Sequence, residues 1–88
     1  MSAWYVYVLQ CSDGSLYCGI TTDVMRRLEE HQSGKGAKYT RARLPLEILV
    51  SWEEENRSTA TKAEIAFKKL SKKKKWQCIE DKRQNPKT

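Results

Sequence analysis

The segment Trp4–Leu9 constrains the fold more than any other part of this sequence, because every position in it is apolar or aromatic. Its even-numbered positions carry tryptophan and valine, and its odd-numbered positions carry tyrosine and leucine. Successive side chains of a strand point to opposite faces of a sheet. A strand that is apolar on both faces has to be covered on both, so we expect Trp4–Leu9 at the centre of a sheet.

The following residues predict a hairpin and a helix. Asp13-Gly14 is a turn signal, and Ser15–Gly19 is typical of the strand that returns from it. We expect the threonine at position 21 or 22 to cap a helix, whose apolar face includes His31. This helix should end near Gly34, where glycine permits a left-handed turn.

The second half predicts one strand and two helices. Residues 34–43 are expected to form a flexible basic loop, and Leu44–Trp52 alternates as a strand does. Ser58 is the expected N-cap of a helix that continues to about Leu70, and Lys72–Arg83 follows as the last helix. The predicted order is β-β-α-β-α-α.

The length of 88 residues fits one domain and leaves no room for two. We expect residues 1–83 to form a single domain of the α+β class and residues 84–88 to be a disordered tail, since Asn85-Pro86 ends the helical pattern.

Three cysteines, Cys11, Cys18 and Cys78, show neither the pairing of a disulfide framework nor the spacing of a zinc site. No apolar run approaches the roughly 20 residues of a membrane span, and the N-terminus lacks the features of a signal peptide. We expect a cytoplasmic protein without disulfides or membrane contact, and a monomer.

The net charge of +6 is unevenly distributed. Residues 69–88 carry eight basic and two acidic side chains, and residues 26–43 carry six basic and two acidic ones. Two basic segments favour a nucleic-acid backbone as the partner, and Tyr39 lies among the basic residues, where it could stack on a base. The candidate nucleic-acid contacts are Gly19, Arg26, Lys35, Lys38, Tyr39, Arg41, Arg43, Lys72, Lys73, Lys74 and Lys75. A merely solubilising loop is the alternative.

Five residues are candidates for chemistry. Tyr7 and Tyr17 should be paired, or nearly so, across the hairpin, although tyrosines on a hairpin usually serve packing. Arg27 and His31 are neighbours on a helix and suit phosphate recognition, or they belong to a solvated face. Glu64 lies at the margin of an apolar stripe, where it could bind Mg²⁺, or pair with the lysine four residues later.

These residues, in this order, resemble the GIY-YIG nuclease superfamily, and within it the small stand-alone bacterial branch UPF0213. The two signature triplets correspond to Tyr5-Val6-Tyr7 and Tyr17-Cys18-Gly19, and Gly34–Lys38 is similar to a stretch of that branch. The resemblance spans residues 4–75. It implies a three-stranded antiparallel sheet flanked by about three helices.

The resemblance also implies a reaction, the hydrolysis of a phosphodiester with one Mg²⁺ or Mn²⁺ ion. Glu64 would hold the metal, and Tyr7 or Tyr17 would act near the attacking water. Arg27 would stabilise charge on the phosphate, with His31 assisting, and Gly19 would permit close approach of a ligand. No element is typical of base-specific reading, so we expect structure to be recognised rather than sequence, in DNA more than in RNA.

Two alternatives remain open. The first is a nucleic-acid-binding module that kept the fold and lost the chemistry, since the asparagine that often follows the family's glutamate has no counterpart near Gln77. The second is an interaction module whose lysine-rich last helix binds an acidic protein or a membrane surface.

Overall fold

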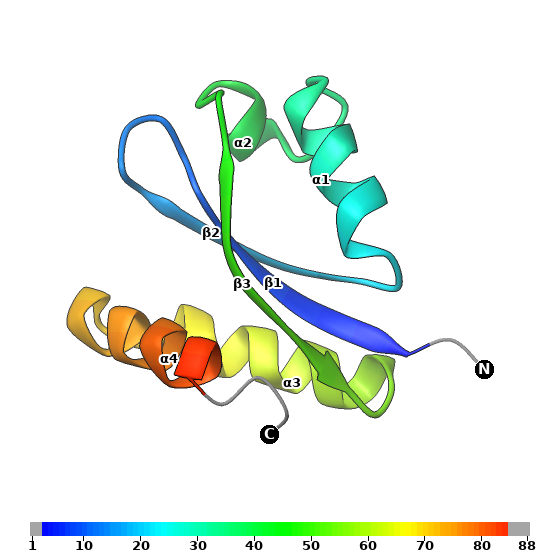
Figure 1. Ribbon diagram of the computed structural model, residues 1–88, viewed down its shortest axis with the longest axis vertical. Coiled ribbons are helices and arrows are strands. Elements are labelled where there is room, and N and C mark those ends of the chain that lie inside the picture. The colour runs from blue at the N-terminus through cyan, green and yellow to red at the C-terminus, as the bar shows by residue number, and fades with distance from the viewer. Residues whose placement is uncertain (1–2, 85–88) are drawn as a thin grey trace.

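Strand β1 (Trp4–Gln10) is the central strand of a three-stranded antiparallel sheet, as its apolar faces predict (Figure 1). This computed structural model describes residues 3–84. Strand β2 (Leu16–Thr21) pairs with one edge of β1, and β3 (Glu47–Glu54) pairs with the other, so the order is β2-β1-β3. Because β2 pairs with β1 alone, it is an edge strand.

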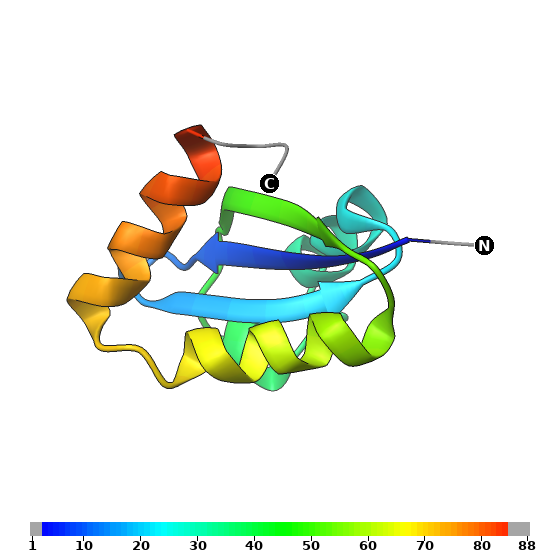
Figure 2. The same cartoon turned by 90° about the horizontal axis from the view of Figure 1, so that it is seen from below.

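Helices cover both faces of this sheet (Figure 1). Helices α1 (Val24–Gln32) and α2 (Lys38–Arg41) lie on one face. Helices α3 (Arg57–Lys68) and α4 (Lys72–Gln84) lie on the other, and α3 runs beside β2 (Figure 2). The predicted fold is confirmed, with one additional short helix, α2, inside the segment expected to be a loop.

The two faces of the sheet build two separate hydrophobic clusters. Val6 and Val8 of β1 pack with Phe67 of α3 and Ile79 of α4 on one face. Tyr7 and Leu9 point to the other face, which α1 covers. The alternation of β1 therefore assigns its odd-numbered side chains to the face that also holds α1 and α2.

Several element boundaries differ from the prediction, and at two helices a better-placed side chain takes the capping position. Asp23, rather than Thr21 or Thr22, caps α1, and its carboxylate accepts from the Arg26 N–H at 3.1 Å. Asn56, rather than Ser58, caps α3 through a reciprocal capping box. Strand β3 begins at Glu47 and not at position 44.

Helix α2 forms where a loop was expected because its backbone is tied locally. The Arg41 N–H donates to the Ala37 carbonyl at 3.0 Å, and the Thr40 hydroxyl donates to the same carbonyl at 2.9 Å. The tail predicted for residues 84–88 lies outside the described residues, except for Gln84, the last residue of α4.

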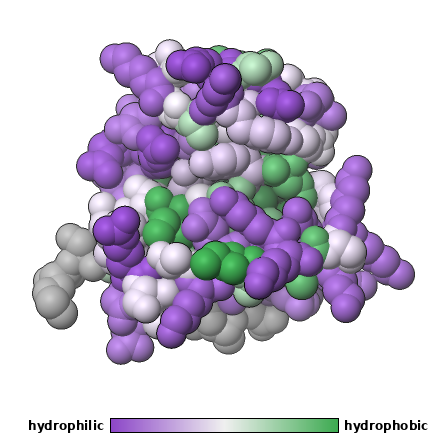
Figure 3. Space-filling model, turned by 180° about the vertical axis from the view of Figure 1, so that it is seen from behind, coloured by the Kyte–Doolittle hydropathy of each residue, from purple (hydrophilic) through white to green (hydrophobic). Residues whose placement is uncertain are grey.

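All three cysteines are free, and Cys11 and Cys18 are buried. Among the described residues, no helix is long and apolar enough to cross a bilayer. The face in Figure 3 is largely hydrophilic, with smaller hydrophobic areas between the charged side chains.

The capping box identifies which residue starts α3, and this is testable. We expect Asn56→Ala to lower the free energy of unfolding by about 1 kcal/mol, because the Thr59 N–H loses its acceptor. Ser58→Ala, at an exposed helical position, should change it by less than about 0.5 kcal/mol. Urea denaturation of both variants measures the difference, and equal losses would contradict the assignment.

Candidate active site

The Tyr7 side chain is buried against β2, and it fits there because the residue opposite it in β2 is a glycine. The side chain is 2% exposed, and Tyr7 pairs directly with Gly19 of β2. A Cβ on Gly19 would collide with the Tyr7 hydroxyl. Gly19 was expected to let a ligand approach; the structure shows that the Tyr7 hydroxyl occupies the space where its Cβ would lie.

Tyr17 is the second tyrosine of the hairpin and is partly exposed. It pairs with Leu9 and is therefore a diagonal neighbour of Tyr7 on the same face. The two ring centroids lie 6.4 Å apart, and the Tyr17 ring meets the His31 ring edge-on at 5.3 Å. The expected proximity of the two tyrosines is confirmed.

His31 connects Tyr7 to α2 through a chain of buried hydrogen bonds. Its Nε2 lies 2.9 Å from the Tyr7 hydroxyl, and its Nδ1 lies 2.8 Å from Thr40 Oγ1. Thr40 gives its only hydroxyl proton to the Ala37 carbonyl, so it must accept from Nδ1–H. The neutral imidazole then carries its proton on Nδ1, and Nε2 accepts from Tyr7.

Gly36 allows the loop before α2 to cross closely over this imidazole. A Cβ at Gly36 would collide with Nδ1 and Cγ of His31. His31 and Thr40 are both completely buried, so no water competes for their hydrogen bonds. The array of Tyr7, His31 and Thr40 is therefore held by packing on every side.

Burial keeps the members of this array uncharged. It raises the pKa of Tyr7 to about 12, against the opposing effect of the nearby Arg27 guanidinium. It also lowers the pKa of His31 below its ordinary value, and the positive charge of Arg27 adds to that effect. At neutral pH a phenol therefore donates to a neutral imidazole.

Arg27 lies at the border between this array and solvent. Its Nη1 is 2.9 Å from Glu30 Oε1, and its side chain is 31% exposed. Arg27 pairs with Glu30, whereas its neighbour His31 turns into the interior, as its place on the apolar face of the helix predicted. Arg26, the next basic residue on α1, is exposed.

Tyr39 extends the aromatic cluster to the surface. Its ring stacks on Tyr17 at 25° with the centroids 6.2 Å apart, and the Arg43 guanidinium lies 3.8 Å from the Tyr39 centroid. Arg43 also binds Asp13 of the hairpin turn at 3.1 Å and donates to the Tyr39 carbonyl at 2.9 Å. The Arg43 side chain thereby clamps α2 to the β1–β2 turn.

Glu64 approaches the site from α3, on the other face of the sheet. Its Oε2 lies 3.3 Å from the Lys68 ammonium, as the alternative to a metal ligand predicted, and the Glu64 side chain is 20% exposed. Lys68 Nζ lies 5.9 Å from the Tyr17 ring centroid, so it links the carboxylate to the tyrosine around the edge of β2. Burial raises the pKa of Cys18 to about 12, and the nearby Glu64 adds to the rise.

The remaining predicted contacts divide into two groups. Lys35, Lys38 and Arg41 are exposed in and around α2. At the start of α4, Lys72 and Lys75 line a hollow beside Tyr39, whereas Lys73 lines a different one, beside Trp76. Lys74 is exposed and lines neither.

Comparison with known proteins identifies the family. The GIY-YIG catalytic domain matches residues 3–77. The chain belongs to the GIY-YIG family. A catalytic domain of this kind implies a nuclease, and the match includes Tyr7, Tyr17 and His31.

Relatives cover most of the chain. A UPF0213 protein of Streptococcus sanguinis is 53% identical over 92% of this chain and 93% of its own length, and one of Cupriavidus necator is 57% identical over 80% and 76%. The solution NMR structure of a UPF0213 protein from Bacillus halodurans has a TM-score of 0.61 and 48% identity, covering 91% of this chain and 85% of that one. The GIY-YIG fold predicted from the sequence is thus confirmed.

Three residues that contact the candidate site residues were not singled out from the sequence. Thr40 looked like an ordinary loop residue, Gly36 like part of a flexible stretch, and Lys68 like a surface partner of Glu64. The four-residue step from Glu64 to Lys68 did predict their pairing. The hydrogen bond between His31 and Thr40 had no local signal, because it depends on how the loop folds back over α1.

The chain of hydrogen bonds predicts an asymmetric response at Thr40. Thr40→Val leaves the buried His31 Nδ1–H without an acceptor and should lower the free energy of unfolding by about 1–3 kcal/mol. Thr40→Ser keeps the hydroxyl and should retain most of the stability. Urea denaturation measures both, and a larger loss from Thr40→Ser than from Thr40→Val would show that packing of the methyl group, rather than the hydrogen bond, matters.

The neutral state of His31 predicts a pH dependence of stability. The unfolded chain takes up a proton on His31 at its ordinary pKa near 6.5, whereas burial lowers that pKa in the folded state. The unfolded state then binds more protons, so stability should fall as the pH drops through the ordinary pKa near 6.5 toward the lowered pKa of the folded state. His31 is the only histidine, so His31→Gln should flatten this part of the profile; an unchanged slope would contradict the assignment.

Proposed function

We propose that this chain is a divalent-metal-dependent nuclease that hydrolyses phosphodiester bonds of DNA in preference to RNA, and reads structure rather than sequence. One observation carries the proposal. The partly exposed Tyr17 lies against the buried array of Tyr7 and His31, and the Lys68–Glu64 ion pair lies beside it. Such an arrangement places a supported tyrosine beside an ammonium group and its partner carboxylate, where a phosphate and its attacking water could be oriented.

Tyr17 is the tyrosine that contacts the attacking water in this proposal. Tyr7 is 2% exposed and gives its proton to His31, whereas Tyr17 lines an open pocket. The water oxygen forms a bond to phosphorus, and the leaving oxygen departs with the electron pair of the broken bond. The proton of the water passes to the Tyr17 hydroxyl, which releases its own proton to solvent, and solvent protonates the leaving oxygen.

Tyr7 and His31 then act as positioning residues. Their ring centroids lie 6.4 and 5.3 Å from that of Tyr17, and the hydrogen bond from His31 to Thr40 fixes the orientation of the imidazole. Arg27 supplies the charge: one edge of its guanidinium is held by Glu30, and the remaining N–H groups suit a phosphate oxygen.

The residues present fit Mg²⁺ or Mn²⁺ at Glu64. Within residues 3–84 no group of three or more histidine, cysteine, aspartate or glutamate side chains could hold a metal. Mg²⁺ keeps several waters and takes one or two carboxylates with substrate phosphates, which a single glutamate provides. When bound, the ion would activate water and offset the charge of the phosphate. Glu64 would exchange its Lys68 partner for this ion.

Replacement of Glu64 tests the proposal. We expect cleavage of plasmid or single-stranded DNA with Mg²⁺ or Mn²⁺ and no cleavage in EDTA. Glu64→Gln keeps the size of the side chain and removes the charge that would hold the metal, so it should reduce the cleavage rate by about two orders of magnitude or more. The rates are measured on a labelled oligonucleotide.

Glu55→Gln is the matched control, because it removes the same charge from an exposed residue between β3 and α3. It should cleave as the wild type does. Equal cleavage by the wild type and Glu64→Gln would overturn the metal site. Binding without cleavage by either protein would favour the alternative of a binding module.

A further inference from the structure

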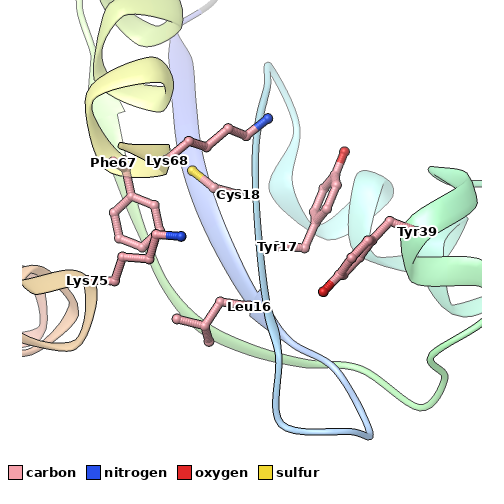
Figure 4. Close-up of a pocket in the computed structure, with 7 residues that line it drawn as sticks. All are labelled: Leu16, Tyr17, Cys18, Tyr39, Phe67, Lys68 and Lys75. Carbon is pink, nitrogen blue, oxygen red and sulfur yellow. The ribbon is translucent and has the colours of Figure 1, made fainter. Parts of the chain in front are cut away.

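A groove adjoins Tyr17, the partly exposed tyrosine of the candidate site. Its first part is a hollow of about 350 Å³ with Leu16, Cys18 and Phe67 as its apolar lining (Figure 4). Its second part, of about 300 Å³, continues past Ser15 and Lys72 of the hairpin and α4. Both parts share Leu16, Tyr39 and Lys75, so they form one groove between β2, α2 and the corner of α3 and α4.

The lining of this groove combines an apolar floor with cationic sides. Leu16 supplies aliphatic surface and Phe67 a flat aromatic ring, and Tyr39 lines both parts of the groove. The ammonium groups of Lys68 and Lys75 project into the space between this apolar floor and Tyr39 (Figure 4). A ligand with a flat aromatic body and negative charges on its flanks satisfies both features, and a nucleotide has this chemistry.

Tyr39 is held rigidly for such a role. The Arg43 guanidinium lies 3.8 Å from the centroid of its ring, and the Tyr17 ring stacks at an offset with the two centroids 6.2 Å apart. Its side chain is nevertheless 39% exposed. Arg43 is itself anchored to Asp13, so the aromatic wall loses little freedom when a ligand binds.

The groove also adjoins the proposed catalytic position. Tyr17 lines it, and Lys68 reaches from it to both Tyr17 and Glu64. A nucleotide bound in the groove would place its phosphate next to Tyr17 and Lys68. Lys72 and Lys75, one helical turn apart on α4, would then meet the next phosphate along the strand.

We propose that this groove is a subsite for one unstacked nucleobase, with its flanking phosphates on Lys68 and on Lys72 and Lys75. The inference rests on the proposed nuclease function and specifies its substrate. A base inside a duplex is paired and stacked and does not fit between Leu16 and Tyr39. The substrate therefore has at least one unpaired nucleotide next to the cleaved bond.

Two strands of equal charge test the subsite. The probes are a fluorescently labelled hexathymidylate and an abasic hexamer with the same phosphates and no bases, and the wild-type protein is titrated in EDTA so that binding alone is read by anisotropy. Base stacking in the groove should make the base-bearing strand bind about 5- to 100-fold more tightly. Equal affinity for the two strands would overturn the subsite.

Variants locate the effect in the groove. Tyr39→Ala should remove most of the preference for the base-bearing strand and leave affinity for the abasic strand nearly unchanged. The pair Lys72→Gln with Lys75→Gln should weaken binding of both strands about fivefold more than Lys73→Gln with Lys74→Gln, which removes the same charge outside the groove. Thermal melts confirm that each variant is folded, and equal losses from the two lysine pairs would overturn the assignment of the phosphates.

The outcomes separate this inference from the proposed function. Cleavage that depends on metal and Glu64, together with equal binding of both hexamers, overturns the base subsite and leaves the nuclease. Failure to bind or cleave any strand overturns the nuclease proposal itself. A base preference that Tyr39→Ala abolishes supports the subsite even without cleavage, because binding is measured in EDTA.

Discussion

The hydrogen bond between Tyr7 and His31 is the interaction on which the arrangement of this domain depends. It joins the central strand to α1 in a place where neither partner meets solvent, so each polar atom needs a partner within the protein. Thr40 satisfies the second imidazole nitrogen and thereby draws the loop and α2 over α1. Among the described residues, no buried polar side-chain atom is left without a hydrogen bond. A polar core of this kind specifies one packing, because a shifted helix would leave several buried groups unpaired.

Two glycines make room for this network, because each lacks a Cβ that would collide with one of the network's side chains. Gly19 gives space to the Tyr7 hydroxyl from the edge strand, and Gly36 gives space to the His31 ring from the loop. The Tyr17 ring then rests on buried groups that cannot move aside, while its own exposed side faces the groove. The two tyrosines thus have different roles. Tyr7, in the central strand, gives rigid support, and Tyr17, in the edge strand, is accessible from the groove.

The sequence predicts well the features that depend on local periodicity. The doubly apolar β1 lies at the centre of the sheet, His31 lies on the buried side of α1, and Lys68 pairs with Glu64. Contacts between distant segments have no such signal. The bond from His31 to Thr40 and the clamp from Arg43 to Asp13 arise only when the loop has folded back. The misplaced caps have a different cause: several polar residues precede each helix, and the backbone geometry decides among them.

The distribution of charge acquires a different meaning in three dimensions. Arg43 was counted among the residues that meet phosphate, yet its guanidinium contacts Asp13, the Tyr39 ring and the Tyr39 carbonyl. The run from Lys72 to Lys75 follows a helix, so consecutive lysines point about 100° apart and divide between two surfaces. Only those that share a side with Tyr17 and Glu64 could act together with them. The position of each charge relative to the edge of β2, rather than the net charge of +6, therefore determines where a polyanion could lie.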